Sequence, residues 1–238
     1  MKEWQVSLGK GMFKYRSFMP LPLIFILFLV FRPGRMGPPW DCLISLFGLL
    51  ISLVGQAIRV HSVGFSNRGA SGRENFFKAE KLNTTGLYSL VRNPLYWGNV
   101  IIFLGLLLAF ANPWAAALML AFLLLEYHFI IRAEEDYLGR IHGDAFNAYC
   151  GQVRRIWPGF HGYKLPPGPF DLQRVILKEN DSLFNIIICF LIIISYKELA
   201  FTGKWNHRFL IIVAALITCA LYLGVKIFKK RIRKNAPL

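Results

Sequence analysis

The strongest constraint in the sequence is a pair of apolar runs, residues 95–111 and 113–131, joined at Asn112. Each run is close to the length of about 20 residues with which a helix crosses a bilayer. A connection this short returns the second helix antiparallel to the first. The polar stretches that flank the pair, 86–98 and 134–158, are therefore predicted to lie at one membrane face. There, polar side chains can converge in water while their supporting helices stand in lipid.

Composition supports a membrane protein. The chain has 238 residues, of which 55% are hydrophobic and 17% are charged, whereas soluble domains carry about 25% charged residues. The apolar residues occur in blocks, which predicts an all-α, polytopic membrane helix bundle. About six spans are expected: 18–31, 40–58, 95–111, 113–131, 182–196 and 209–225. The first of these is shorter than a full span and contains two prolines.

The distribution of basic residues predicts the orientation of the bundle. With six spans, both termini and both polar stretches lie on the side that carries 23 of the 28 Lys and Arg residues. Basic residues gather in the cytoplasmic segments of membrane proteins, so we expect both termini and the candidate site in the cytoplasm. The same rule accounts for the net charge of +15 without a nucleic-acid partner, and none is predicted.

Three regions follow from this pattern. Residues 1–39 form an N-terminal segment with the first span, 40–165 a membrane core, and 166–238 a linker followed by a C-terminal hairpin and a basic tail. Residues 59–85 are polar and are expected in a cytoplasmic loop or at the interface. The four cysteines have no metal-site spacing and are expected to be small buried side chains, so no metal is predicted.

The first polar stretch has the features of a helix start. Asn93 is a good N-cap and Pro94 suits the first helical turn. One interpretation is structural, in which Arg92 contacts lipid phosphate and Tyr96 belongs to an interfacial aromatic belt. The other is functional, because free N–H groups at a helix N-terminus attract an anionic group. The ring faces of Tyr88 and Tyr96 can hold a cation or an adenine.

The second stretch brings ionisable residues to the end of the fourth apolar run. Glu126 and His128 lie within the apolar block, where such residues are costly and often functional. Glu126 shares a helical face with Glu134 at four-residue spacing. The structural alternatives are an interhelical hydrogen bond for His128 and a solvated turn for Glu134 and Glu135.

As an ordered set, the two stretches resemble the isoprenylcysteine carboxyl methyltransferase and phospholipid methyltransferase superfamily. These are integral membrane enzymes that use S-adenosylmethionine. The resemblance covers about residues 80–160 and is carried by Gly86, Tyr88, Arg92, Asn93, Pro94, Tyr96, Gly98, Glu134, Glu135, Gly143, Phe146, Tyr149, Val153, Arg155 and Pro158.

Several positions depart from the family pattern. Asn93 stands where the carboxyl methyltransferases have His, which is closer to the phospholipid N-methyltransferases, and Ile130 stands where they tend to have Arg. Phe146 replaces a usual Tyr. Related sterol reductases, which use NADPH, have Asn at the position of Leu95 and an acidic residue at that of Asn99. An NADPH-dependent sterol-reductase-like enzyme is therefore the alternative, and a non-catalytic membrane protein is a second one.

The resemblance, together with the chemistry of the residues, implies that some residues bind the methyl acceptor and others bind the methyl donor. The acceptor is expected to be a membrane lipid or a prenylated molecule, methylated on a carboxyl oxygen or an amino nitrogen. Glu135 or His128 would accept a proton, and Arg155 would hold an anionic head group. The residues expected to bind S-adenosylmethionine are Tyr88, Arg92, Asn93, Pro94, Leu95, Tyr96 and Glu134.

Overall fold

A computed structural model describes residues 3–37, 39–66, 81–159 and 162–235, and the side chains up to residue 231. This part of the chain is all-α, as the sequence predicts, and one isolated bridge joins Gly86 to Lys164. Part of the loop expected at 59–85, residues 67–80, lies outside the described residues. The elements are α1 (Glu3–Tyr15), α2 (Pro20–Val30), α3 (Trp40–Gly64), the 3₁₀ helix η1 (Leu87–Ser89), α4 (Pro94–Phe110), α5 (Pro113–Gln152), α6 (Leu172–Thr202) and α7 (Arg208–Asn235).

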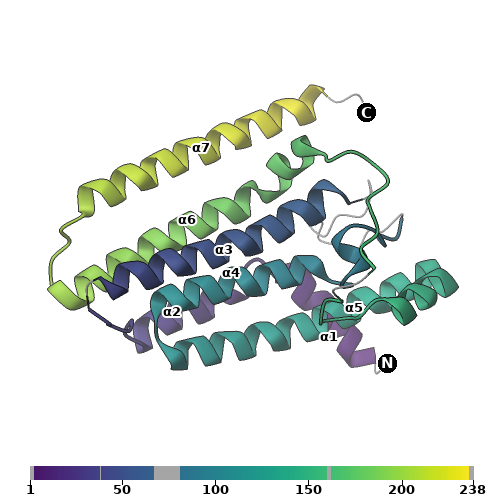
Figure 1. Ribbon diagram of the computed structural model, residues 1–238, viewed down its shortest axis with the longest axis horizontal. Coiled ribbons are helices and arrows are strands. Elements are labelled where there is room, and N and C mark those ends of the chain that lie inside the picture. The colour runs from purple at the N-terminus through teal and green to yellow at the C-terminus, as the bar shows by residue number, and fades with distance from the viewer. Residues whose placement is uncertain (1–2, 38, 67–80, 160–161, 236–238) are drawn as a thin grey trace.

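The helices form an elongated bundle. Figure 1 shows α3, α4 and α6 in its middle, with α5 beside α4 at one edge and α7 outside α6 at the other. The chain begins near the same end of the bundle at which α7 finishes (Figure 1). The turn from α4 to α5 and the turn from α6 to α7 lie at the opposite end.

The protein is a multi-pass integral membrane protein, although six full spans are not found in the described residues. Four helices are long and apolar enough to cross a membrane, namely α3, α5, α6 and α7. Helices α1 and α2 qualify only as a pair, and they are bent by 73° at the break between them. Helix α4 is apolar but has 17 residues. The expected count therefore becomes four or five spans plus the shorter α4.

The α4–α5 hairpin forms where the sequence predicts it. Ala111 adopts a left-handed conformation (φ 59°) that ends α4. The side chain of Asn112 then accepts hydrogen bonds from the N–H groups of Trp114 (3.1 Å) and Ala115 (3.0 Å). Since Asn112 satisfies two of the unpaired donors at the start of α5, a two-residue turn is enough to reverse the chain.

Small residues bring α3 and α4 into close contact. A Cβ atom added at Gly105 would lie 2.2 Å from the carbonyl oxygen of Gly48, and one added at Gly98 would lie 2.8 Å from that of Gly55. Between these contacts the hydroxyl of Ser52 donates to a carbonyl oxygen of α4 over 2.9 Å. Such stripes of small residues allow membrane helices to pack backbone against backbone. Gly98, a residue of the first polar stretch, therefore has a packing role.

A buried ion pair fixes α6 to α3 and α4. The guanidinium of Arg59 on α3 meets the carboxylate of Glu179 on α6 through two contacts, Nε–Oε2 at 2.8 Å and Nη2–Oε1 at 3.0 Å. Arg59 also donates to Oδ1 of Asn99 on α4 over 2.5 Å. Arg59 and Glu179 are only 9% and 3% exposed. The pair links the C-terminal hairpin to α3 and, through Asn99, to α4, which carries part of the first polar stretch.

Helix α5 contains a break that redirects the second polar stretch. At Gly143 the backbone has φ 49° and ψ −122°, outside the helical region. Residues with a side chain rarely adopt this conformation, whereas glycine does so at little cost. In Figure 1 the end of α5 turns back beyond the bundle, which returns the following residues toward η1 and the start of α4.

Candidate active site

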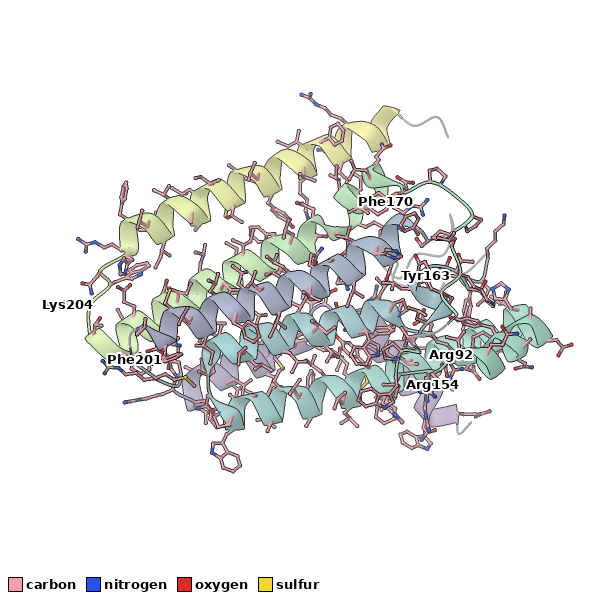
Figure 2. All side chains as sticks on the ribbon, in the orientation of Figure 1. Arg92, Arg154, Tyr163, Phe170, Phe201 and Lys204 are labelled. Atoms are coloured by element: carbon pink, nitrogen blue, oxygen red, sulfur yellow. The ribbon has the colours of Figure 1, made fainter. Side chains whose placement is uncertain are left out.

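The two polar stretches meet at one end of the bundle. The backbone N–H of Arg92 donates to the carbonyl oxygen of Arg154 over 3.0 Å. The side-chain amide of Asn93 donates to the carbonyl oxygen of Arg155 over 3.1 Å. Figure 2 shows Arg92 and Arg154 close together at this end, far from Lys204 in the α6–α7 turn. The hairpin thus places both stretches at one face, as the sequence predicts.

The N-terminus of α4 opens into this site without a side-chain cap. Asn93 occupies the N-cap position, but its side chain forms no capping hydrogen bond. The expectation that it caps the helix is therefore wrong, because the amide is used to hold the backbone of Arg155. The N–H groups of Leu95 and Tyr96 lie in the first turn after Pro94, where an α-helix provides no backbone acceptor. This positive helix end suits an anionic group.

Glu134 is held beside two tyrosines. The hydroxyl of Tyr96 donates to Oε2 of Glu134 over 3.0 Å. The backbone oxygen of Tyr88 accepts a hydrogen bond of 2.7 Å from the Tyr149 hydroxyl, which ties η1 to the second stretch. Burial raises the pKa of the Tyr88 hydroxyl, and the negative charge of Glu134 raises that pKa further. Tyr88 is therefore a neutral hydrogen-bond donor close to Glu134.

Glu135 lies between two guanidinium groups. Its Oε1 is 3.5 Å from Nη1 of Arg92, and its Oε2 is 3.2 Å from Nε of Arg155. Burial lowers the pKa of Arg155, and Glu135 opposes that effect. Within the described residues, several buried atoms of this group have no hydrogen-bond partner: Arg92 Nε, Glu135 Oε1, and Nε and Nη2 of Arg155. Because unsatisfied buried polar atoms are costly, these atoms fit a polar ligand.

Two polar side chains from the same segments lie apart from this cluster. His128 is on an exposed position of α5 and packs edge-on against Phe129, with ring centroids 5.4 Å apart. Its predicted role as a proton acceptor thus gains no support from its position. The side chain of Arg154 is also exposed, and only its backbone takes part.

Two neighbours of the site were not identified from the sequence. The thiol of Cys150 accepts a hydrogen bond from Nη1 of Arg92 over 2.6 Å. The sequence did contain a signal for this thiol, because Cys150 directly follows Tyr149, a residue of the second stretch. Arg16, in the break between α1 and α2, exerts its positive charge on both Tyr96 and Glu134. No spacing in the sequence relates Arg16 to these residues, because their proximity depends on how α1 packs against α5.

Comparison with known proteins agrees with this geometry. Residues 43–145 match the phospholipid methyltransferase family. This part of the chain is therefore similar to that family. The matched range covers α4 and most of α3 and α5, and it includes every residue of the first polar stretch together with Glu134 and Glu135. It ends before Tyr149 and Arg155.

A curated relative extends the likeness. The chain is 30% identical over 136 residues to Protein-S-isoprenylcysteine O-methyltransferase B of Arabidopsis thaliana, which is 55% of this chain and 66% of that protein. The chain thus spans slightly less than two thirds of this relative's length. No solved structure matches the chain. The family resemblance identified in the sequence is confirmed, and the comparisons give no support to the reductase alternative.

Proposed function

We propose that the protein is an integral membrane methyltransferase that moves a methyl group from S-adenosylmethionine to a lipid-like or prenylated acceptor. The observation that carries this proposal is the meeting of the two polar stretches, which places Tyr96 with Glu134 and Arg92 with Glu135 and Arg155 in one cluster. Similarity to the phospholipid methyltransferase family and to a Protein-S-isoprenylcysteine O-methyltransferase supports the reaction class.

The chain's own groups match the charges of the donor, which supplies a methyl group on a cationic sulfur. The uncapped N-terminus of α4, including the N–H groups of Leu95 and Tyr96, would hold the donor's carboxylate. Glu134 would attract its cationic groups, and Tyr96 orients this carboxylate through their hydrogen bond. Tyr88 would add a neutral hydrogen-bond donor. Fixing the donor in this way supplies alignment, the main contribution an enzyme makes to such a transfer.

The arginine cluster is the best candidate for the acceptor side. Arg155 is held by Glu135, yet its Nη2 has no hydrogen-bond partner within the described residues. An anionic head group can use this donor, since guanidinium binds carboxylate and phosphate well. Nearby, the rings of Trp97 and Trp157 pack edge-on at 5.8 Å, as expected of residues at headgroup depth. A lipid that diffuses in from the bilayer keeps its tail there, so little apolar surface crosses water.

We also infer a cytoplasmic site, with both termini on the cytoplasmic side. The site lies at the end of the bundle where the chain begins and where α7 finishes (Figure 1), and the basic residues concentrate on that side. A topology reporter fused after Leu238 should read out in the cytoplasm. A readout on the other side of the membrane contradicts this inference.

Cofactor binding tests the proposal. Adenosylhomocysteine, the product form of the donor, should raise the thermal midpoint of the detergent-solubilised protein, because a ligand that binds the folded state stabilises it. Glu134→Gln should reduce that shift. Asp136→Asn is the matched control, because Asp136 is a carboxylate on the same helix that pairs with Arg140 at 2.9 Å. Stabilisation by NADPH instead of adenosylhomocysteine would favour the reductase.

Acceptor class is tested with purified enzyme, methyl-labelled S-adenosylmethionine, and either total lipid extract or the soluble metabolite pool. Label should enter the lipid fraction. Arg155→Ala should raise the KM for the acceptor more than the KM for the donor, since Arg155 is assigned to the acceptor. Label that enters only the soluble pool contradicts a lipid acceptor.

A further inference from the structure

Glu126 is an ionisable residue in the apolar interior that the site described above does not use. It lies on α5 and is 2% exposed, between Leu123 and Ile130, which are both fully buried. Within the described residues, neither oxygen of its carboxylate has a hydrogen-bond partner. A buried carboxylate without a donor is unfavourable, and in a membrane span such a residue points to function.

The N-terminal helix closes this region. Helix α1 packs so tightly on α5 that a Cβ atom added at Gly9 would lie 2.2 Å from the carbonyl oxygen of Phe129. One turn beyond, Phe13 joins the buried core of the bundle. Arg16 follows at the break between α1 and α2, and its positive charge acts on Glu126. Glu126 therefore has a cation in its vicinity, although that cation does not satisfy its oxygens.

Glu126 is connected to the candidate site along one helix face. It precedes Glu134 by two helical turns, which is about 12 Å along the axis. The ring of Tyr127, the residue after Glu126, packs against the ring of Tyr96, with centroids 5.0 Å apart. Tyr96 in turn donates to Glu134. These contacts connect the surroundings of Glu126 to the candidate site.

We propose that Glu126 binds the amino group of an amphiphilic ligand, which under the proposed function is the methyl acceptor. The described residues offer no donor for these two oxygens, so a ligand would bring one, and an ammonium group brings both donors and charge. A ligand carboxylate would be repelled by Glu126 at this position. Arg16 can face an anionic group next to the amine. This assignment favours an amine over a carboxyl acceptor.

The test uses the full chain in dodecylmaltoside without any methyl donor. Three probes of equal chain length are added at matched concentrations: dodecylamine, dodecanol and dodecanoate. Dodecylamine should raise the thermal midpoint in a concentration-dependent way, and the other two should not. Equal shifts from all three would show only detergent-like partitioning and would overturn the proposal.

Variants locate the binding. Glu126→Gln should abolish the dodecylamine shift and raise the thermal midpoint of the ligand-free protein, because a neutral amide costs less to bury than a carboxylate. Asp136→Asn, a carboxylate change on the same helix, should leave the shift intact. If Glu126→Gln does not fold, Glu126→Asp keeps the charge and should retain the preference for the amine with weaker binding. A dodecylamine shift that persists in Glu126→Gln, or a preference for the amine that is absent in Glu126→Asp, would overturn the assignment.

The outcome is separable from that of the proposed function. A dodecylamine shift without an adenosylhomocysteine shift would leave the amine site standing and remove the methyltransferase proposal. An adenosylhomocysteine shift without a dodecylamine shift would keep the methyltransferase and remove Glu126 from the acceptor site.

Discussion

Helices α4 and α7 are both apolar, yet they are surrounded differently. Six of the 17 residues of α4 are buried, and three of these are small: Gly98, Gly105 and Ala109. In α7 none of the most apolar window is buried, and among the described elements this helix packs mainly on α6. The position of α4 is therefore set by contacts with protein, whereas α7 needs lipid or detergent around most of its surface. Substitutions in the two regions should have very different effects.

The largest effect is expected at the buried ion pair that joins the interior to α6. Glu179→Ala leaves the guanidinium of Arg59 buried without its partner, which costs about 3–5 kcal/mol in the free energy of unfolding. Replacing both residues, Arg59→Met with Glu179→Leu, should recover most of that loss. Denaturation in detergent measures both. A control is Arg140→Ala, which removes an i,i+4 pair whose arginine side chain is 71% exposed and should cost no more than about 0.5 kcal/mol. Equal losses in Glu179→Ala and Arg140→Ala would show that the pair is not buried.

The next effect tests the α3–α4 contact directly. In Gly105→Ala the new methyl group meets backbone at 2.2 Å, so the helices must separate at a cost of about 1–3 kcal/mol. The matched change in the exposed helix is Gly224→Ala, where nothing lies within 4 Å. It should be neutral or slightly stabilising, because alanine favours helix. Thermal midpoints that fall equally in the two variants would contradict the difference between α4 and α7.

A third substitution tests the break in α5 rather than packing. Gly143→Ala forces a side chain into a positive-φ conformation with open space around it, which costs about 1–3 kcal/mol. Because the break returns Tyr149 to its hydrogen bond with the backbone of Tyr88, a residue assigned to the donor, binding of adenosylhomocysteine should also weaken. Gly151→Ala, also in open space but without positive φ, is the control and should keep both stability and binding. Loss of stability without loss of binding would show that the break does not position the site.

Local features of the molecule were predictable from the sequence, whereas contacts between distant helices were not. The turn at Asn112 and the meeting of Arg92 with Arg155 were predictable, because a short connection leaves little choice of geometry and an ordered set of residues marks the site. The ion pair of Arg59 with Glu179, and the proximity of Arg16 to Glu126, were not. Each joins segments far apart in the chain, through helix faces whose relative rotation no local pattern specifies. The hydrogen bond from the Asn93 side chain to the backbone of Arg155 was also not predictable, because it depends on where the second stretch lies relative to α4.

The smallest effect is expected in the α6–α7 hairpin. The rings of Phe184 and Tyr222 stack with centroids 4.2 Å apart, and the Tyr222 hydroxyl donates to Asp181 over 3.0 Å. Tyr222→Phe keeps the stacking and removes one hydrogen bond, so the loss should be about 1 kcal/mol or less. Leu216→Ala, at a position that is 63% exposed, removes a side chain that contacts mainly lipid and should leave the unfolding midpoint in detergent unchanged within error. A loss from Leu216→Ala as large as that from Gly105→Ala would show that α7 has a protein partner on its open face, and cross-linking of α7 to a second copy would then identify whether that partner is this same chain.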